Sequence, residues 1–174
     1  MGIWDVKRDN ERTQWVFVPQ VSVGPLHFGM APDDVSAALG SKPSARRLVQ
    51  RSSGGYELVE SQFTKPKVTV YYAPGQTLAC VAVDALAGPQ VMLDGTALVA
   101  RVPSETEEWL CKHAEADEFD LFYTHAADPG SGDLGLIVRA QRAGDIVLTR
   151  PLFLTREWAE NSWDCVPGEE WSTF

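Results

Sequence analysis

The sequence predicts an α+β protein: a single domain over residues 1–174 in which a mainly antiparallel, meandering sheet carries two helices on one face. Three observations lead to this prediction. Short β-rich runs follow one another through turns that are too short for helical crossovers, which indicates antiparallel neighbours. Two segments, at 32–39 and 103–115, carry the signals that begin and end helices. With 174 residues and a hydrophobic content of 44%, the chain is long enough to bury a core.

The first predicted helix, 32–39, is specified mainly by its ends. Pro32 suits the first helical position because its ring fixes φ near the helical value. Val35 and Leu39 share one face at i and i+4, and Gly40 is well suited to the left-handed residue that ends a helix. These residues predict a short helix packed on a strand, and they predict no chemistry.

The second predicted helix, 103–115, has a capping box. Ser104 is the expected N-cap, and Glu107 stands three residues later. Trp109 and Leu110 belong to one apolar sector, which predicts that this side of the helix is buried against the sheet.

The strands are predicted from β-branched and aromatic runs bounded by turn residues. A turn is expected at 52–55, a two-residue hairpin at Asp94-Gly95, and a flexible hairpin loop at 126–133. The strands are expected at 14–18, 46–51, 56–63, 67–73, 77–83, 90–93, 96–99, 119–125, 134–139 and 145–149.

One segment resembles known families. Gly29-Met30, then Val35, then Leu39-Gly40 resembles the "Gly-Met, helix, Leu-Gly" segment of two groups of small bacterial α+β proteins. One group comprises the small lipoproteins of outer-membrane assembly and the β-lactamase inhibitor proteins, and the other comprises immunity-type proteins. The resemblance implies a helix packed on an antiparallel sheet and a role in binding another protein. It departs from the pattern at Ala31, where a Ser or Thr cap is usual, and no lipoprotein signal precedes it.

The net charge of −9 lies entirely in the second part of the chain. Residues 1–100 carry 9 acidic and 9 basic side chains, whereas residues 101–174 carry 15 acidic and 6 basic ones. Such a field repels phosphate backbones and attracts basic proteins, so no nucleic-acid partner is expected. The three scattered cysteines fit a reducing compartment. With no signal peptide and no membrane-length apolar run, we expect a cytoplasmic protein that does not bind membranes.

No catalytic, cofactor-binding or metal-binding residues are predicted. The sequence lacks a nucleophile elbow, phosphate-binding glycine loops and the spacings of zinc or EF-hand sites. We therefore expect a non-catalytic protein-binding module, and an immunity-type inhibitor of a toxin or enzyme is its most specific form. An enzymatic or small-molecule-binding domain, with a site assembled only in space, is the alternative.

Residues 1–12 are expected to form a loose N-terminal segment, and residues 156–174 an acidic, tryptophan-rich tail. Tryptophans are enriched in binding hot spots, and acids around them steer cationic partners. The tail is therefore a candidate contact surface for another protein. Deleting residues 157–174 is expected to reduce stability modestly and to abolish association with a partner or with a second copy. Two alternatives remain open, namely packing of the tail on its own sheet and its exchange with a second copy in a homodimer. The candidate partner-binding residues are Trp158, Trp163, Glu157, Glu160, Asp164 and Trp171.

Overall fold

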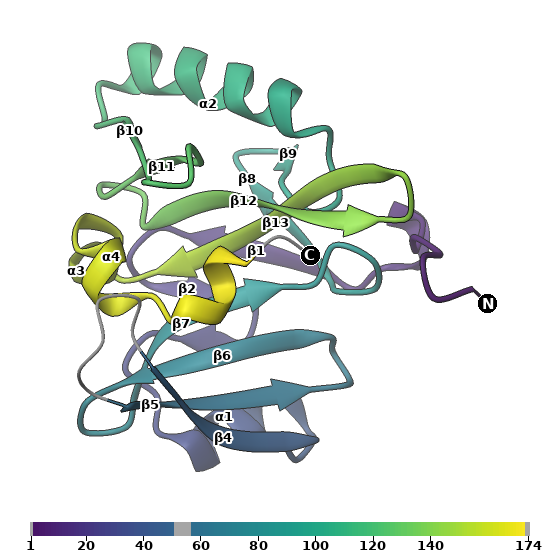
Figure 1. The fold of residues 1–174 in the computed structure, drawn as a ribbon, viewed down its shortest axis with the longest axis vertical. Helices are drawn as coiled ribbons and strands as arrows, with labels where there is room; N and C mark the ends of the chain where they lie inside the picture. Colours follow the sequence, from purple (N-terminus) through teal and green to yellow (C-terminus); the bar gives the residue numbers. More distant parts are fainter. Residues whose placement is uncertain (1, 51–56, 173–174) are drawn as a thin grey trace.

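The computed structural model describes residues 2–50 and 57–172, and within them two β-sheets share one hydrophobic core (Figure 1). The larger sheet is antiparallel throughout, and in the smaller one β1 and β8 run parallel. The larger sheet contains, in spatial order, β10 (Phe122–Tyr123), β11 (Pro129–Ser131), β12 (Leu136–Ala143), β13 (Ile146–Leu154), β7 (Thr77–Val83), β6 (Val68–Ala73), β5 (Glu57–Phe63) and β4 (Ala45–Gln50). The smaller contains β3 (Leu26–His27), β2 (Ser22–Val23), β1 (Gln14–Val18), β8 (Gln90–Leu93) and β9 (Thr96–Ala97).

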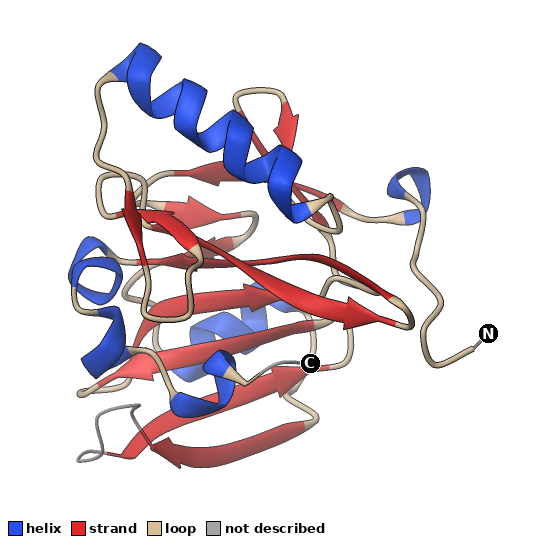
Figure 2. Ribbon diagram, turned by 45° about the horizontal axis from the view of Figure 1, so that its top comes forward, coloured by secondary structure: helices blue, strands red, loops and turns tan. Residues whose placement is uncertain are grey.

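Four α-helices accompany the sheets in the described part of the chain (Figure 2). They are α1 (Pro32–Leu39), α2 (Pro103–Asp117), α3 (Arg156–Glu160) and α4 (Ser162–Cys165), with 3-10 turns η1 (Asp9–Glu11) and η2 (Gly168–Trp171). The predicted α+β class with antiparallel strands is confirmed. The expectation of one sheet with two helices was wrong, because the β1–β8 pairing is distant in sequence and α3 and α4 are too short to show a helical period.

The eight-stranded sheet consists of two meanders joined side by side. Strands β4 to β7 form one and β10 to β13 form the other. The joining contact pairs β13 with β7, where Leu152 lies opposite Ala82. The predicted meander is therefore found within each half of the sheet, and the pairing of β13 with β7 joins the two halves into one continuous sheet.

Alternating side chains give the large sheet two covered faces. Val70 of β6 enters the core between the sheets, where Val35 of α1 and Leu110 of α2 are also fully buried. The next residue, Tyr71, points to the opposite face. That face is covered by the C-terminal helices, which contribute Trp158 to a second core cluster. Both longer helices thus serve one core, and the C-terminal segment closes the other.

The start and end signals in the sequence predict the boundaries of α1 correctly but not the N-cap of α2. α1 begins at Pro32, and Gly40 follows it with a left-handed φ of 64°, as predicted. α2 begins at Pro103, so Val102 is the N-cap and no side chain caps the helix. The predicted capping box at Ser104 was wrong, because Pro103 takes the first helical position and places the N-cap at Val102, two residues earlier.

One strand prediction and one loop prediction also need correction. Only Phe122–Tyr123 of the expected strand 119–125 pairs with a neighbour. The expected flexible loop at 126–133 contains β11, and its Asp128 is buried and accepts a hydrogen bond from Arg139. The hairpin at Asp94-Gly95 is confirmed, with φ of 49° and 80°. The turn expected at 52–55 lies outside the described residues.

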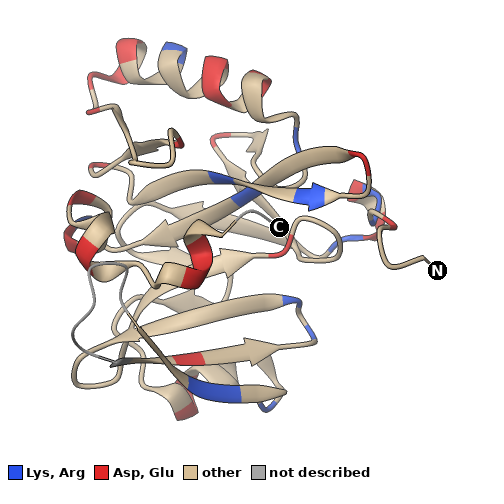
Figure 3. Cartoon of the chain, viewed as in Figure 1, with Lys and Arg blue, Asp and Glu red and all other residues tan. Residues whose placement is uncertain are grey.

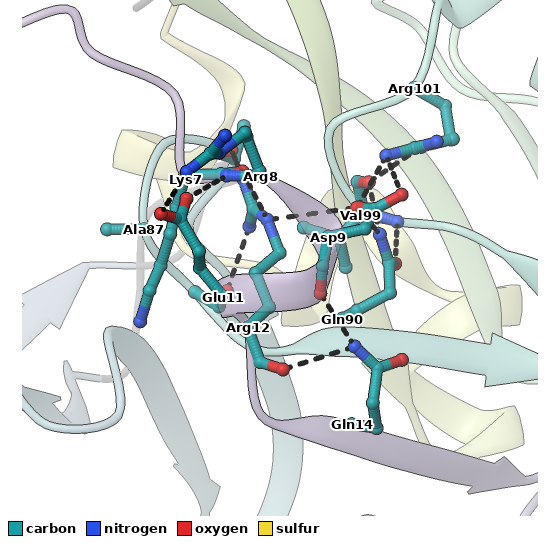
Figure 4. Close-up of polar contacts among 12 residues, drawn as sticks. Lys7, Arg8, Asp9, Glu11, Arg12, Gln14, Ala87, Gln90, Val99 and Arg101 are labelled. Carbon is teal, nitrogen blue, oxygen red and sulfur yellow. Dashed lines mark hydrogen bonds and ion pairs between the residues drawn. The ribbon is translucent and has the colours of Figure 1, made fainter.

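Arg12 anchors the N-terminal segment (Figure 4). Residues 2–11 are exposed, but Arg12 is only 4% exposed. Its guanidinium donates to four backbone carbonyl oxygens at 2.8–3.1 Å, those of Lys7, Ala85, Leu86 and Gly88. One side chain therefore joins the segment to the loop that precedes β8.

We expect Arg12→Met to lower the free energy of unfolding by about 3 kcal/mol, because it leaves buried carbonyls without donors. Urea unfolding followed by fluorescence measures this change. Arg8→Met is the matched control, since Arg8 lies in the same segment but is exposed and bonds only to neighbouring Glu11. Equal midpoints for the two variants would show that Arg12 is not an anchor.

Candidate functional site

The acidic C-terminal segment, residues 156–172, folds back onto the large sheet. The Thr155 hydroxyl accepts a hydrogen bond from the Trp158 backbone N–H and so caps α3. Trp158 is 3% exposed and packs in the same cluster as Cys165 and Val166. Of the alternatives left open by the sequence, packing of the tail on its own sheet is the one observed.

A buried ion pair fastens the end of this segment. Glu170 of η2 is 1% exposed, and the Arg150 guanidinium donates to it at 2.9 Å. The Tyr71 hydroxyl donates to the same carboxylate oxygen at 2.6 Å. Arg139 donates to the Glu170 carbonyl oxygen at 2.9 Å and to the Asp128 carboxylate at 2.6 Å. The segment is therefore held by charge-assisted hydrogen bonds as well as by apolar packing.

The electrostatics of this cluster set the protonation states. Burial acts to raise the pKa of Glu170, but the charge and hydrogen bonds of Arg150 outweigh it, and the pKa is lowered overall. Burial raises the pKa of Tyr71, and the adjacent Glu170 carboxylate raises it further. Glu170 is thus an anion at neutral pH, and Tyr71 is a neutral donor.

The cluster continues across the sheet because paired strands align its members. Arg47 of β4 lies opposite Glu60 of β5, and Glu60 lies opposite Tyr71 of β6. Arg47 donates to Glu60 at 2.9 Å, and Glu169 of η2 accepts from Arg47 and Tyr71. A cavity of about 220 Å³ remains under η2 beside these residues. This polar cluster was not predicted, because its members come from β4, β5, β6, β12, β13, η2 and the residues before β11, which only the fold brings together.

The outward side of the same region carries exposed aromatic and apolar side chains. From 121 to 125 burial alternates, so Leu121, Tyr123 and His125 point outward while Thr124 is buried. Trp163 of α4 is 50% exposed, and its ring centroid lies 4.4 Å from that of His125 in an edge-on arrangement. Four side chains from two segments therefore form one exposed row.

Acidic groups border this row. Glu107 of α2 accepts a hydrogen bond from the Tyr123 hydroxyl at 2.8 Å, which with the nearby Cys111 thiol raises the pKa of Tyr123 to about 12. Glu160 of α3 and Asp120 both lie against Gly132, so they are close to each other. We call this surface the acidic–aromatic face, and it comprises Leu121, Tyr123, His125 and Trp163 with Glu107, Asp120, Glu160 and Asp164.

Asp120 is the most strongly organised of these acids. Partial burial acts to raise its pKa, but backbone N–H groups of Asp133 and Gly132 and the Ser131 hydroxyl donate to it and lower the pKa overall. Its negative charge is therefore a fixed feature of the surface at neutral pH. Figure 3 shows acidic residues on α2, with one basic residue among them, and on α3–α4, whereas basic residues lie on β4, on β12–β13 and at the β5–β6 turn.

The structure separates the six predicted partner-binding residues. Trp163 lies on the acidic–aromatic face, Glu160 lies beside Asp120 at its border, and Asp164 is exposed next to Trp163 in the chain. Glu157 is exposed but borders a different hollow, beside Phe28 and Thr77. Trp171 is partly buried, with its ring 4.6 Å from that of His125. Trp158 belongs to the core, so its indole ring offers no surface to a partner in this arrangement.

The half of this face that lies outside residues 156–172 was not predicted. Leu121, Tyr123 and His125 alternate with Phe122 and Thr124, and this period of two was available in the sequence. It predicts which side chains share a face, but it does not reveal that Trp163, 38 residues beyond His125, lies on the same face.

No protein-family model matches the chain, and neither a curated protein nor a solved structure shows detectable similarity to it. The resemblance at Gly29–Gly40 therefore stays a prediction. Within the described ranges, no helix combines the length and apolar character that crossing a bilayer requires. The same residues contain no group of three His, Cys, Asp or Glu side chains arranged to hold a metal ion.

Proposed function

We propose that the protein is a non-catalytic binding module that captures a basic protein partner through the acidic–aromatic face. The observation that supports this most directly is Trp163, which is half exposed, positioned by His125 and bordered by acids. An exposed Trp that lies in a row with other exposed aromatic and apolar side chains is typical of an interaction site, and Trp is a usual anchor of interfaces. An inhibitor of a basic toxin or enzyme is the most specific form of the proposal.

The charge of the face supports a basic partner. Glu107 accepts a hydrogen bond from Tyr123 of the exposed row, and Asp120 with the nearby Glu160 borders it. Asp164 follows Trp163 in the chain, and α2 adds further exposed acids. Such a field accelerates association with a cation and discriminates against acidic proteins. The aromatic row then supplies contact area that is desolvated on binding.

The same charge argues against a homodimer built on this face. A two-fold dimer places the same patch of both copies together. Here it would bring two sets of acids into contact, and like charges at an interface cost several kcal/mol. A partner of opposite charge is therefore better suited to this surface than a second copy.

We expect Trp163→Ala to weaken binding of the partner about 30-fold, since truncating an anchoring Trp costs about 2 kcal/mol or more. The partner is isolated by affinity capture on the full-length protein, and its dissociation constant is then measured by calorimetry. Glu160→Lys should slow association and reduce the salt dependence of the rate.

Trp4→Ala is the matched control, because Trp4 is 44% exposed but lies in the N-terminal segment. The proposal requires a captured protein whose affinity falls with Trp163→Ala and not with Trp4→Ala. If every captured protein binds the two variants equally well, or if none binds, the acidic–aromatic face is not a protein-binding site.

A further inference from the structure

A second, oppositely charged site lies on another part of the molecule. A cleft of about 640 Å³ opens where the N-terminal segment, β1, the end of α1, the β5–β6 turn and the loop before β8 converge. This volume lies within the range of small-molecule pockets, roughly 300–1,000 Å³. The cleft shares no residue with the acidic–aromatic face.

Three lysines line this cleft, namely Lys7, Lys65 and Lys67. All three are exposed, and no acidic side chain in the described ranges lines the cleft with them. None of the three forms an ion pair with a described residue. Three ammonium groups that form no ion pair with a described residue, in a chain of net charge −9, make a local reversal of the overall charge.

The floor of the cleft is apolar. Trp15, which is 7% exposed, lines the cleft together with Leu39 and Pro89. The Trp15 ring packs directly on Gly24, where a Cβ atom would lie 2.4 Å from it. Any side chain at Gly24 would displace this ring, so the close approach fixes the position of the floor.

Hydrogen bonds from neighbouring side chains hold the backbone of the segments that carry Lys7 and Lys65. Arg12 donates to the Lys7 carbonyl oxygen at 2.9 Å, and in Figure 4 the Lys7 side chain extends away from that cluster. The Ser41 hydroxyl donates to the Lys65 carbonyl oxygen at 2.8 Å and so joins the β5–β6 turn to the end of α1. The backbone that carries these lysines is therefore in place before any ligand arrives, which lowers the entropic cost of binding.

We propose that this cleft binds an anionic small molecule with an apolar, ring-containing body. The ring system would cover Trp15, Leu39 and Pro89, and carboxylate, phosphate or sulfonate groups would accept hydrogen bonds from the three lysines. The apolar floor supplies contact area, and the ammonium groups select for negative charge. This site is independent of the proposed protein-binding face.

The test uses two fluorescent probes that differ by one sulfonate, 8-anilinonaphthalene-1-sulfonate and the neutral N-phenyl-1-naphthylamine. Titration of the full-length protein should show saturable binding of one sulfonate probe per chain and at least tenfold weaker binding of the neutral one. Lys65→Gln and Lys67→Gln should each weaken binding of the sulfonate probe about fivefold, and the triple variant with Lys7→Gln about 100-fold.

Lys42→Gln is the matched control, because Lys42 is exposed on the loop after α1 and does not line the cleft. It should bind the sulfonate probe like the wild type, and all four variants should melt at the wild-type temperature. Equal binding of both probes would overturn the proposal, as would equal weakening by Lys42→Gln and Lys65→Gln. Absence of saturable binding to the wild-type protein would also overturn it.

Discussion

Deleting residues 157–174 is expected to unfold the protein. The deletion removes Trp158, Cys165 and Val166 from the core that covers the second face of the large sheet. Removing a buried Trp alone costs about 3–5 kcal/mol, and the whole domain is expected to have only about 5–15 kcal/mol of stability. The deletion also leaves Arg150 without the Glu170 carboxylate. Circular dichroism and a thermal melt of the truncated chain measure the outcome.

From the sequence, only a modest loss of stability was expected for this deletion, because residues 156–174 were interpreted as a tail. The buried position of Trp158 changes that expectation. Deleting residues 2–6 is a suitable control, since all five are exposed. That variant should keep the wild-type spectrum and nearly its melting temperature. A truncated chain that melts cooperatively within a few degrees of the wild type would show that the second core is not needed.

Replacing Glu170 by alanine is expected to lower the free energy of unfolding by about 3–5 kcal/mol, the usual cost of removing one partner of a buried ion pair. The substitution leaves the Arg150 guanidinium buried without the Glu170 carboxylate, and it removes the closer of the two acceptors of the Tyr71 hydroxyl, with Glu169 remaining at 3.0 Å. Urea unfolding followed by tryptophan fluorescence measures the change.

Glu157→Ala is the matched control, because it removes an exposed acid from the same segment. It should leave the unfolding midpoint unchanged. Equal midpoints for the two alanine variants would show that apolar packing alone holds the C-terminal segment in place.

The Glu170 carboxylate also makes the free energy of unfolding depend on pH, and the direction of this dependence follows from its pKa. The folded-state pKa of Glu170 lies below its ordinary value of 4.5. Its contribution is therefore fully present above about pH 4.5 and is lost as the pH falls through the lowered folded-state pKa. In Glu170→Gln the contribution is missing at every pH, so the stability difference from the wild type should be constant at neutral pH and should shrink below pH 4.5. A difference that does not shrink in acid would assign the effect to something other than this carboxylate.

The sequence by itself determined the local elements with strong end signals. Pro32 and Gly40 bracket α1, and Asp94-Gly95 forms the β8–β9 hairpin, because fixed or left-handed φ values are properties of single residues. The central strands β6 and β7 were predicted from their β-rich composition and flanking turns.

Only the tertiary structure decided how these pieces meet. The parallel contact of β1 with β8 and the antiparallel contact of β13 with β7 join segments about 70 residues apart, and no local pattern encodes such a pairing.

The charges show the same division most clearly. From the sequence, Glu157, Glu160 and Glu170 were equivalent acids of one tail. In the fold, Glu160 faces solvent beside Asp120, Glu157 borders a separate hollow, and Glu170 is buried against Arg150. Net charge is a sum that the sequence determines. The position of each charge depends on which surfaces become buried, and that is a property of the packed chain alone.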